Sequence, residues 1–425
     1  MARIAAASFA GTSIEFYDFF VYGTAAALVL GPLFFPGISP IAGTLAAFAT
    51  YAVGFVARPL GSVLFGRLGD RRGRRPVLVV SLLMTGVATV LVGLLPTYDH
   101  IGPAAPILLV LLRFLQGLGV GGEWGGAVLL AAEHAPPGRR ALWASFPQAG
   151  PAIGFLLANG IMLTLSGTLT DGQFHSWGWR VPFVFAGVLA AVGLMLRASI
   201  EETPQFRELV AADEISPSPF KDVVREQWRL ILLVAGALTC GYVAFYLTTT
   251  WSLHYATTRL DVGRTTMLGC IMFAVVCKAA ATPLFALLGD RYGRRPLCVA
   301  GCAAIGVWAF PMLGLLATGE PAWITLACVG TLIAFIAMFS VVGAYLCELF
   351  EPRVRCTGAS TAYNLGGVLG GALTPIVATE LARGDGTPWG VAAYLAGAAA
   401  LSVACFTALP ETRAVFANEG KPVPA

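Results

Sequence analysis

Six ionisable residues lie inside long apolar stretches of this 425-residue sequence. If such stretches cross a bilayer, each charged side chain at its centre costs about 3 kcal/mol or more. Residues kept there at this cost usually line solute pathways, relay protons or pair with one another. The first candidates for chemistry in this chain are therefore Glu15, Asp18, Arg58, Arg113, Glu123 and Lys278.

We expect the three acids to carry protons. Glu15 and Asp18 are three residues apart, so a helix places them on one face. A carboxyl group in a desolvated pocket can take up and release a proton as a neighbouring cation comes and goes. The alternative for both is a static ion pair with Arg58 that joins two helices. Glu123 is a further proton site, or it hydrogen-bonds the glycine-rich backbone around it.

We expect the two buried arginines to bind the carboxylate of a solute. Arg58 and Arg113 carry planar guanidinium forks, which hold carboxylates in bidentate fashion. For Arg113 the alternative is a structural salt bridge to Glu15 or Asp18.

Lys278 is the most unusual of the six residues. It precedes Asp290 by twelve residues, which places it roughly 18 Å inside the bilayer if the helix continues. Its side chain is too short to reach water from that depth. We expect it to face a cavity and an anionic solute, or else Asp18 or Glu123 across an interface.

Several uncharged polar and aromatic side chains could complete a binding cavity. Rings and hydrogen-bond donors suit a planar or hydroxylated solute, although each such residue is individually more often a packing residue or an interfacial anchor. The candidates are Tyr22, Gln116, Trp124, Tyr246 and Asn364.

The elements that carry these residues are membrane-spanning helices. Hydrophobic residues make up 57% of the chain and charged residues 12%, about half the charged share of a soluble domain. Stretches of about 20 apolar residues can cross a bilayer. Twelve are found, at about 7–33, 41–65, 77–96, 104–133, 142–168, 181–198, 230–254, 265–288, 297–317, 322–349, 357–382 and 389–409.

The distribution of positive charge predicts the orientation. With both termini in the cytoplasm, 20 of the 27 Lys and Arg residues fall in inner segments and 4 in outer ones. Cytoplasmic loops are enriched in these residues. We therefore expect a multi-pass protein of the cell (inner) membrane with cytoplasmic termini.

An internal repeat divides the chain into two halves. GDRRGRRP at 69–76 recurs as GDRYGRRP at 289–296, and a second segment recurs at an offset of 215. Two parallel six-helix copies enclose a site at their interface. We predict an amino-terminal bundle at 1–198, a cytoplasmic linker at 199–229 and a carboxy-terminal bundle at 230–425.

The repeated segments also predict a gate. Asp70 and Arg74 are four residues apart, as are Asp290 and Arg294. We expect Asp70 to face the other half, where the helix that starts after Arg355 has a positive dipole end. The alternative is that the arginines serve topology alone. The predicted gate comprises Gly69, Asp70, Arg71, Arg74, Glu133, Arg140, Asp290, Arg294, Glu348 and Arg355.

GRLGDRRGRR at 66–75, with its echo at 289–295, resembles the signature loop of the major facilitator superfamily. The metabolite:proton symporter family is the closer resemblance, and it extends over essentially the whole chain. It rests on GTSIEFYDFFVYG at 11–23, FVARPLG at 55–61, QGLGVGGEWGGA at 116–127, WGWRVPF at 177–183 and ELFEPRVRCTGAS at 348–360.

This resemblance implies a major facilitator fold and proton-coupled symport by alternating access. The family includes carriers of shikimate, α-ketoglutarate, citrate and proline or betaine, and the shikimate-like branch is the most similar. A small organic anion, such as a shikimate-like hydroxylated monocarboxylate, is the favoured solute. A zwitterion such as proline or betaine, or transport without protons, is the alternative.

Other classes of function find little support in the sequence. No nucleophile–base or metal constellation indicates an enzyme, and the nine cysteines form no CxxC pair. We therefore expect no catalytic residues, no cofactor and no metal. The net charge of +4 is too small to indicate nucleic acid. The expected partners are the solute, protons and lipid, with the monomer as the functional unit.

Overall fold

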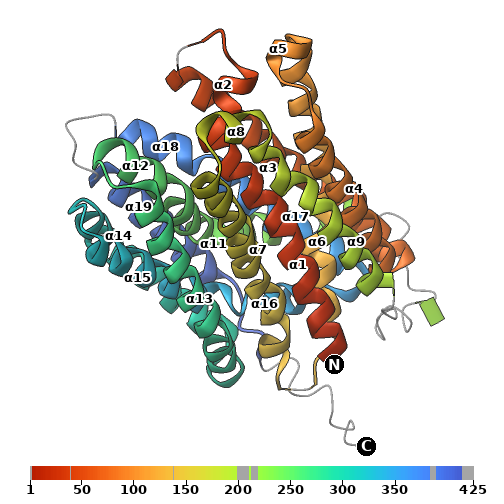
Figure 1. Cartoon of the computed structure of the whole chain (residues 1–425). Coiled ribbons are helices and arrows are strands. Elements are labelled where there is room, and N and C mark those ends of the chain that lie inside the picture. Colours follow the sequence, from red (N-terminus) through yellow and green to blue (C-terminus); the bar gives the residue numbers. More distant parts are fainter. Residues whose placement is uncertain are drawn as a thin grey trace, which may run out of the picture.

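The computed structural model describes residues 2–38, 40–136, 138–198, 210–211, 219–382 and 389–413. These residues form helices packed side by side, and none of them is in a strand (Figure 1). Most of the predicted linker, residues 199–209 and 212–218, lies outside the described part.

Six long helical runs form the amino-terminal bundle. The first is α1 (Ala2–Ala25), which continues through the π-helical turn η1 (Ala26–Leu30) into α2 (Gly31–Phe34). The others are α3 (Pro40–Arg72), α4 (Arg74–Leu94), α6 (Ala104–Glu133), α7 (Arg140–Thr168) and α9 (Val181–Ala198). The connections hold α5 (Tyr98–Ile101), α8 (Asp171–Ser176) and η2 (Gly178–Arg180).

The carboxy-terminal bundle repeats this plan. Its first run is α11 (Pro219–Tyr246), the π-helical turn η3 (Leu247–Trp251) and α12 (Ser252–Arg259). Next come α13 (Arg264–Tyr292), α14 (Arg294–Leu316), α15 (Pro321–Phe339) with α16 (Val342–Leu349), and the turn η4 (Pro352–Val354). The last two runs are α17 (Arg355–Gly367) with η5 (Val368–Ala372) and α18 (Thr374–Leu381), and α19 (Trp389–Ala408).

The predicted fold, twelve membrane helices in two six-helix bundles, is confirmed. Nine helices within the described ranges are long and apolar enough to cross a membrane. Three further runs, 2–34, 40–72 and 355–381, complete the twelve. Each of these three carries polar residues near its middle, among them Asp18, Arg58 and Asn364.

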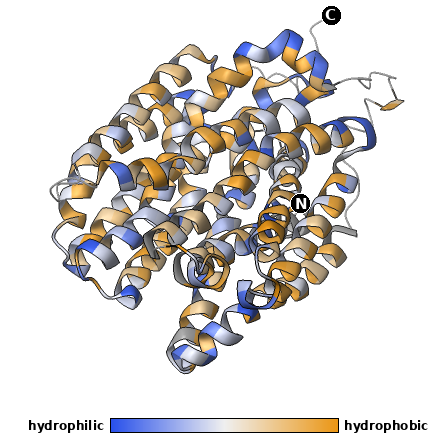
Figure 2. Ribbon diagram, turned by 90° about the horizontal axis from the view of Figure 1, so that it is seen from above, coloured by the Kyte–Doolittle hydropathy of each residue, from blue (hydrophilic) through white to orange (hydrophobic). Residues whose placement is uncertain are grey.

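Lipid-facing helices expose apolar side chains at helical spacing. On α4 the exposed residues recur every three or four positions, and all are at least 45% exposed: Val80, Leu83, Val87, Leu91 and Leu94. Hydrophobic residues make up much of the helices in the view from above (Figure 2). A soluble protein rarely exposes so much apolar surface, whereas lipid solvates it.

Glycines bring α3 and α6 into direct backbone contact. A Cβ added to Gly117 would overlap the carbonyl oxygen of Gly54. Small residues permit such close approach in membrane bundles. The contact holds Arg58 of α3 and Arg113 of α6 in neighbouring parts of the same bundle.

Both repeats turn sharply at a glycine after the GDR segment. Gly73 has φ 98° and Gly293 has φ 112°, a conformation that only glycine adopts without strain. Contacts from Asp70 to Cys356, Asp290 to Ala141 and Arg355 to Glu133 place both turns at one end of the molecule. We call this end the motif end.

The two bundles meet along two helix pairs, α3 with α17 and α7 with α13. Each pair joins the second run of one repeat to the fifth run of the other. A pseudo-two-fold relation between the halves produces this exchange, and two of the three cavities described below lie between the bundles.

Candidate functional site

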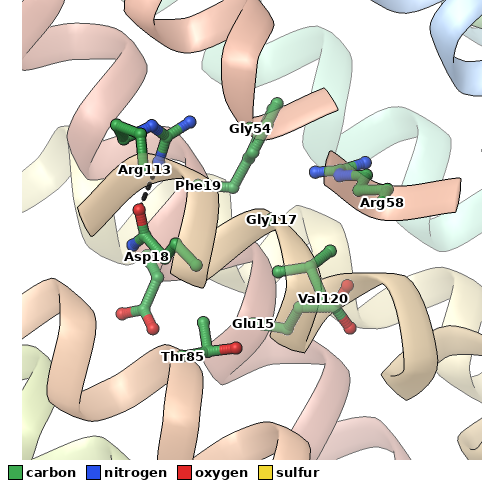
Figure 3. A pocket seen from close by; sticks show the side chains of 10 residues that line it. Glu15, Asp18, Phe19, Gly54, Arg58, Thr85, Arg113, Gly117 and Val120 are labelled. Carbon is green, nitrogen blue, oxygen red and sulfur yellow. Dashed lines mark hydrogen bonds between the residues drawn. The ribbon is translucent and has the colours of Figure 1, made fainter. Parts of the chain in front are cut away.

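A small pocket inside the amino-terminal bundle gathers two predicted acids and two predicted cations (Figure 3). Its free volume is about 10 Å³. The charged side chains that line it are at most 5% exposed, so they interact with little competition from water. We call it the acidic pocket, lined by Glu15, Asp18, Phe19, Gly54, Arg58, Thr85, Arg113, Gln116, Gly117 and Val120.

Arg113 is held by neighbours within its own bundle. Its guanidinium donates a hydrogen bond to Gln116, whose amide donates in turn to Thr89. It also lies 3.8 Å from the centre of the Tyr22 ring, in cation–π geometry, and the Tyr22 hydroxyl is hydrogen-bonded to Thr50. Gln116 therefore lines the acidic pocket, whereas Tyr22 supports Arg113 from outside it.

Arg58 connects the acidic pocket to a second cavity. Its guanidinium lies 4.4 Å from the centre of the Phe55 ring and 4.7 Å from that of Phe19. The side chain is 5% exposed and lines both spaces. Because one cation serves both, a change on one side alters the electrostatics of the other.

The second cavity lies between the bundles and has a free volume of about 30 Å³. That volume holds about one water molecule, so the cavity is contracted in this structure. Aromatic rings form most of its wall. We call it the central cavity, lined by Phe16, Arg58, Gln148, Pro151, Tyr242, Phe245, Tyr246, Lys278, Phe335, Phe339 and Tyr363.

Lys278 lies in the central cavity, 2% exposed. Its Nζ is 3.5 Å from the carbonyl oxygen of Gln148 and 5.5 Å from the centre of the Phe335 ring. No carboxylate of the described residues lies within ion-pair distance of this Nζ. The Gln148 Nε2 is also buried and donates to no described acceptor. The Lys278 ammonium group and the Gln148 amide group are thus hydrogen-bond donors at this cavity. Among the described residues, the Gln148 carbonyl oxygen is the acceptor for Lys278, and the Gln148 Nε2 has none.

The two cations of the central cavity occupy equivalent places in the repeat. Arg58 and Lys278 are 220 positions apart, the offset that separates the two GDR segments. Gln148 and Tyr363 are 215 apart, the offset of the second repeated segment. Each bundle therefore contributes one cation and one polar side chain from matching helices.

Stacked rings separate the central cavity from the motif end. Trp124 of α6 and Tyr363 of α17 stack with centroids 3.6 Å apart and an interplanar angle of 7°. Trp124 Nε1 donates to Gln148 Oε1 at 3.5 Å. The Asn364 amide donates to the carbonyls of Gly121 and Ser360, at 2.9 Å each. The structure thus places Trp124 and Asn364 in the contact between bundles and Tyr246 in the cavity wall.

A larger cavity opens on the other side of the stacked rings, away from the motif end. Its volume is about 190 Å³, and threonine is the most frequent residue of its lining. It lies between α1 and α7 of one bundle and η3, α12 and α13 of the other. Its residues are Phe20, Gly23, Thr24, Tyr51, Phe155, Asn159, Thr249, Thr250, Leu253, His254, Thr257, Thr258, Arg264 and Leu268.

At the motif end, an acid from each bundle caps a helix of the other bundle. Asp70 accepts hydrogen bonds from the backbone N–H groups of Cys356 at 3.2 Å and Thr357 at 3.0 Å, at the start of α17. Asp290 accepts from those of Ala141 at 3.0 Å and Leu142 at 3.1 Å, at the start of α7. Carboxylates are stabilised at helix N-termini by these free N–H groups and the helix dipole.

Ion pairs within the carboxy-terminal half, and one between the halves, support these caps. Arg294 pairs with Asp290 and with Glu348, both at 3.1 Å, and Arg355 lies 3.7 Å from Glu133. These side chains are almost fully buried, so their pairing is less screened than on a surface.

The remaining gate candidates divide into packed, exposed and undescribed side chains. A Cβ on Gly69 would lie 2.8 Å from Cys356 Sγ, so this glycine packs directly against the other bundle. Arg71 is exposed, and Arg140 lies beside the capped start of α7. The side chains of Arg74 and Glu123 lie outside the described part of the structure.

A family model described as Major Facilitator Superfamily matches residues 8–355. The chain belongs to the major facilitator superfamily.

Curated members of this superfamily match nearly the full length. The inner membrane metabolite transport protein YhjE of Escherichia coli (strain K12) is 44% identical over 97% of this chain and 94% of its own length. The shikimate transporter of the same organism is 39% identical over 92% and 91%, and its proline/betaine transporter is 32% identical over 95% and 82%.

The fold agrees with solved superfamily structures. The proton:xylose symporter XylE bound to 6-bromo-6-deoxy-D-glucose superposes with a TM-score of 0.78 over 96% of both chains, at 18% identity. The inward-open form of the xylose transporter XylE from E. coli gives 0.70 over 98% of both, also at 18%. This superfamily member is therefore a multi-pass membrane transporter of metabolites and not an enzyme.

Sequence reasoning missed several residues of this transporter's cavities. Gln148, Phe245, Phe335 and Phe339 line the central cavity, and Asn159 and His254 line the larger one. None of them is a charged residue at mid-depth, and the sequence analysis selected its first candidates by the free-energy cost of burying a charge in the bilayer. It therefore did not select these residues. The internal repeat could have identified Gln148, because Gln148 and Tyr363 occupy equivalent positions at the offset of 215 and both line the central cavity.

Proposed function

We propose that this superfamily member is a secondary active transporter that couples proton symport to the movement of a small hydroxylated organic anion by alternating access. The observation that carries the proposal is the pair Arg58 and Lys278, which reach one aromatic cavity from equivalent helices of the two halves. An anion bound between them would touch both bundles at once.

The lining of the central cavity favours an anion with a flat, partly apolar body. Lys278 has no described carboxylate in reach, and the Gln148 Nε2 has no described acceptor. Burying donors without acceptors is costly, and a bound carboxylate with hydroxyl groups removes that cost. The surrounding rings suit the ring face of such a solute. A relative transports shikimate, as its name states.

Proton coupling would run through Arg58. Glu15 and Asp18 lie in the acidic pocket, which shares this guanidinium with the central cavity. A solute carboxylate that engages Arg58 competes with the acids for its positive charge, so one of them takes up a proton. Glu123 is a further proton site in this proposal.

In alternating access the two ends of the molecule would open and close in turn. Here the Asp70 and Asp290 caps join the bundles at the motif end, while the larger cavity lies at the opposite end. Separation of the caps would open the motif end, as rocking of one bundle against the other requires. We place the motif end and both termini in the cytoplasm, the protein in the inner membrane, and transport in the monomer.

The proposal is tested by uptake into proteoliposomes that contain the purified protein. Labelled shikimate and labelled proline are supplied with and without an inward proton gradient, after a thermal-shift screen of organic acids and zwitterions. We expect an acid to raise the unfolding temperature and to accumulate only with the gradient. Accumulation of proline alone would establish a zwitterion carrier, and equal shikimate equilibration with and without the gradient would establish uncoupled transport.

A further inference from the structure

The first two and a half turns of α11 form an amphipathic segment ahead of the predicted membrane span at 230–254. Residues 219–227 precede a kink at Gln227, where φ is −127° and ψ is 19°. Val223 is fully buried and anchors the segment to the protein. Most of its remaining side chains are exposed, so the segment has a surface of its own.

Two rows of side chains run along this surface. Phe220, Val224 and Trp228 are 37%, 43% and 49% exposed and recur every four residues. Basic residues follow each of them by one position: Lys221, Arg225 and Arg229. At 100° per residue Phe220 and Val224 occupy a sector of the helix adjacent to that of Lys221 and Arg225. Trp228 and Arg229 lie just past the kink, where both are exposed and the Arg229 guanidinium is 5.4 Å from the centre of the Trp228 ring.

The basic row is not neutralised by the described part of the protein. No carboxylate of the described residues lies within ion-pair distance of Lys221, Arg225 or Arg229. The neighbouring Glu226 instead pairs with Arg353 at 2.8 Å. Three cations thus stand beside an exposed apolar row with no described acid to pair with them.

The pair Glu226–Arg353 fixes where this surface lies. Arg353 belongs to η4, which directly precedes α17, and the first amides of α17 are capped by Asp70. The surface is thus at the motif end, just before the membrane span that the sequence predicts at 230–254. Basic amphipathic segments at this level insert their apolar side among acyl chains and hold anionic headgroups on the basic side.

We propose that residues 220–229 bind the phosphodiester headgroups of anionic phospholipids through Lys221, Arg225 and Arg229, with Phe220, Val224 and Trp228 among the acyl chains. The apolar row argues for a lipid over a free phosphate ion, which would use only the cations. Through Glu226 and Arg353 the bound lipid is linked to the helix that closes the motif end.

Trp228 reports directly on this site. The full-length protein is reconstituted in nanodiscs of phosphatidylcholine that contain increasing fractions of brominated phosphatidylglycerol, whose bromine atoms quench nearby indoles. Subtracting the signal of Trp228→Phe isolates Trp228 from the other eight tryptophans. Brominated phosphatidylcholine in place of phosphatidylglycerol measures quenching without headgroup selection.

We expect Trp228 to be quenched at a lower fraction of brominated phosphatidylglycerol than of brominated phosphatidylcholine. The triple variant Lys221→Gln, Arg225→Gln, Arg229→Gln should lose this preference, because each basic residue near an anionic surface strengthens binding about fivefold. A matched control, Arg67→Gln, Arg139→Gln, Arg291→Gln, removes the same charge from exposed residues of the motif end and should keep it.

Three outcomes would overturn the proposal. The wild-type protein could show equal quenching by the two lipids. The control variant could lose the preference as fully as the triple variant, which would indicate a general effect of net charge. Inorganic phosphate could abolish the preference at constant ionic strength, which would assign the cations to a soluble anion.

Discussion

At the residue scale, the central cavity holds more positive charge than the described residues balance. Arg58 lies between aromatic rings and lines the same pocket as the acids Glu15 and Asp18. Lys278 faces, among the described residues, only aromatic rings and one carbonyl oxygen. Burying a cation without a partner destabilises a folded protein. The stability lost in the empty state can be regained when an anion binds.

Replacing Lys278 with Ala or Met should separate binding from folding. Loss of a charge-assisted hydrogen bond costs about 1.5–3 kcal/mol, so the affinity for an anionic solute should fall roughly 10- to 100-fold. Without solute, Lys278→Met should unfold at the same or a higher temperature, because an uncompensated buried charge is gone. Thermal-shift titration with shikimate measures both effects. If Lys278→Met kept the wild-type response, Lys278 would not bind the solute.

Replacing Asp18 with Asn should uncouple the transporter. The amide keeps the shape of the carboxyl group but cannot carry a proton, so solute exchange should continue while gradient-driven accumulation falls at least about tenfold. Counterflow of labelled solute without a gradient and uptake with one are measured on the same proteoliposomes. Asp99→Asn, at an exposed position outside the cavities, is the control. Undiminished gradient-driven uptake by Asp18→Asn would move the proton to Glu15 or Glu123.

A sequence pattern predicts how deep a residue lies along a membrane helix, but not toward which neighbour its side chain points. Depth along a helix can be counted, and the count placed Lys278 deep in the membrane and facing a cavity, where it lines the central cavity with Arg58. Direction around the helix depends on neighbours that the pattern does not contain. Tyr22 therefore lies against the Arg113 guanidinium, and Asn364 lies in the contact between the bundles. Both Tyr22 and Asn364 were predicted to line the cavity.

At the element scale, three of the helical runs that border the cavities are interrupted by π-helical turns. The first runs of the two repeats contain π-helical turns at matching places, Ala26–Leu30 and Leu247–Trp251, and the eleventh contains one at Val368–Ala372. Such turns are frequent at functional sites, and helices broken near the midplane recur in transporters. The repeated GDR segments predicted the two halves, but no residue pattern predicted these turns.

Close packing of α3 and α6 should be needed to hold the acidic pocket. In Gly117→Ala the new methyl group would meet the Gly54 carbonyl oxygen, and overpacking of this kind costs about 1–3 kcal/mol. At Gly160 of α7 a new methyl group would meet no described atom within 4 Å, so Gly160→Ala should leave stability unchanged or slightly raised. Unfolding temperatures in detergent compare the two. Equal unfolding temperatures of the two variants would show that α3 and α6 can move apart at Gly117 without loss of stability.

At the scale of the whole molecule, the two halves are joined by reciprocal contacts. Each bundle supplies one acid to the other, Asp70 to α17 and Asp290 to α7, so neither cap can break without relative motion of the bundles. The caps and the stacked rings of Trp124 and Tyr363 lie on the same side of the central cavity. In the transport cycle proposed above, opening toward the motif end would require all these contacts to separate together, as in a two-state gate.

A covalent link across this gate should arrest transport. A Cβ on Gly69 would lie 2.8 Å from Cys356 Sγ, which is within reach of a disulfide bond. We expect Gly69→Cys to cross-link the halves on oxidation and to regain uptake on reduction, whereas Gly69→Cys with Cys356→Ser should respond to neither treatment. A protease site inserted in the predicted linker at 199–229 reports the link, because the cleaved halves then migrate together without reductant. Full uptake by the cross-linked protein would show that the motif end stays closed during transport, and it would rule out alternating access through that end.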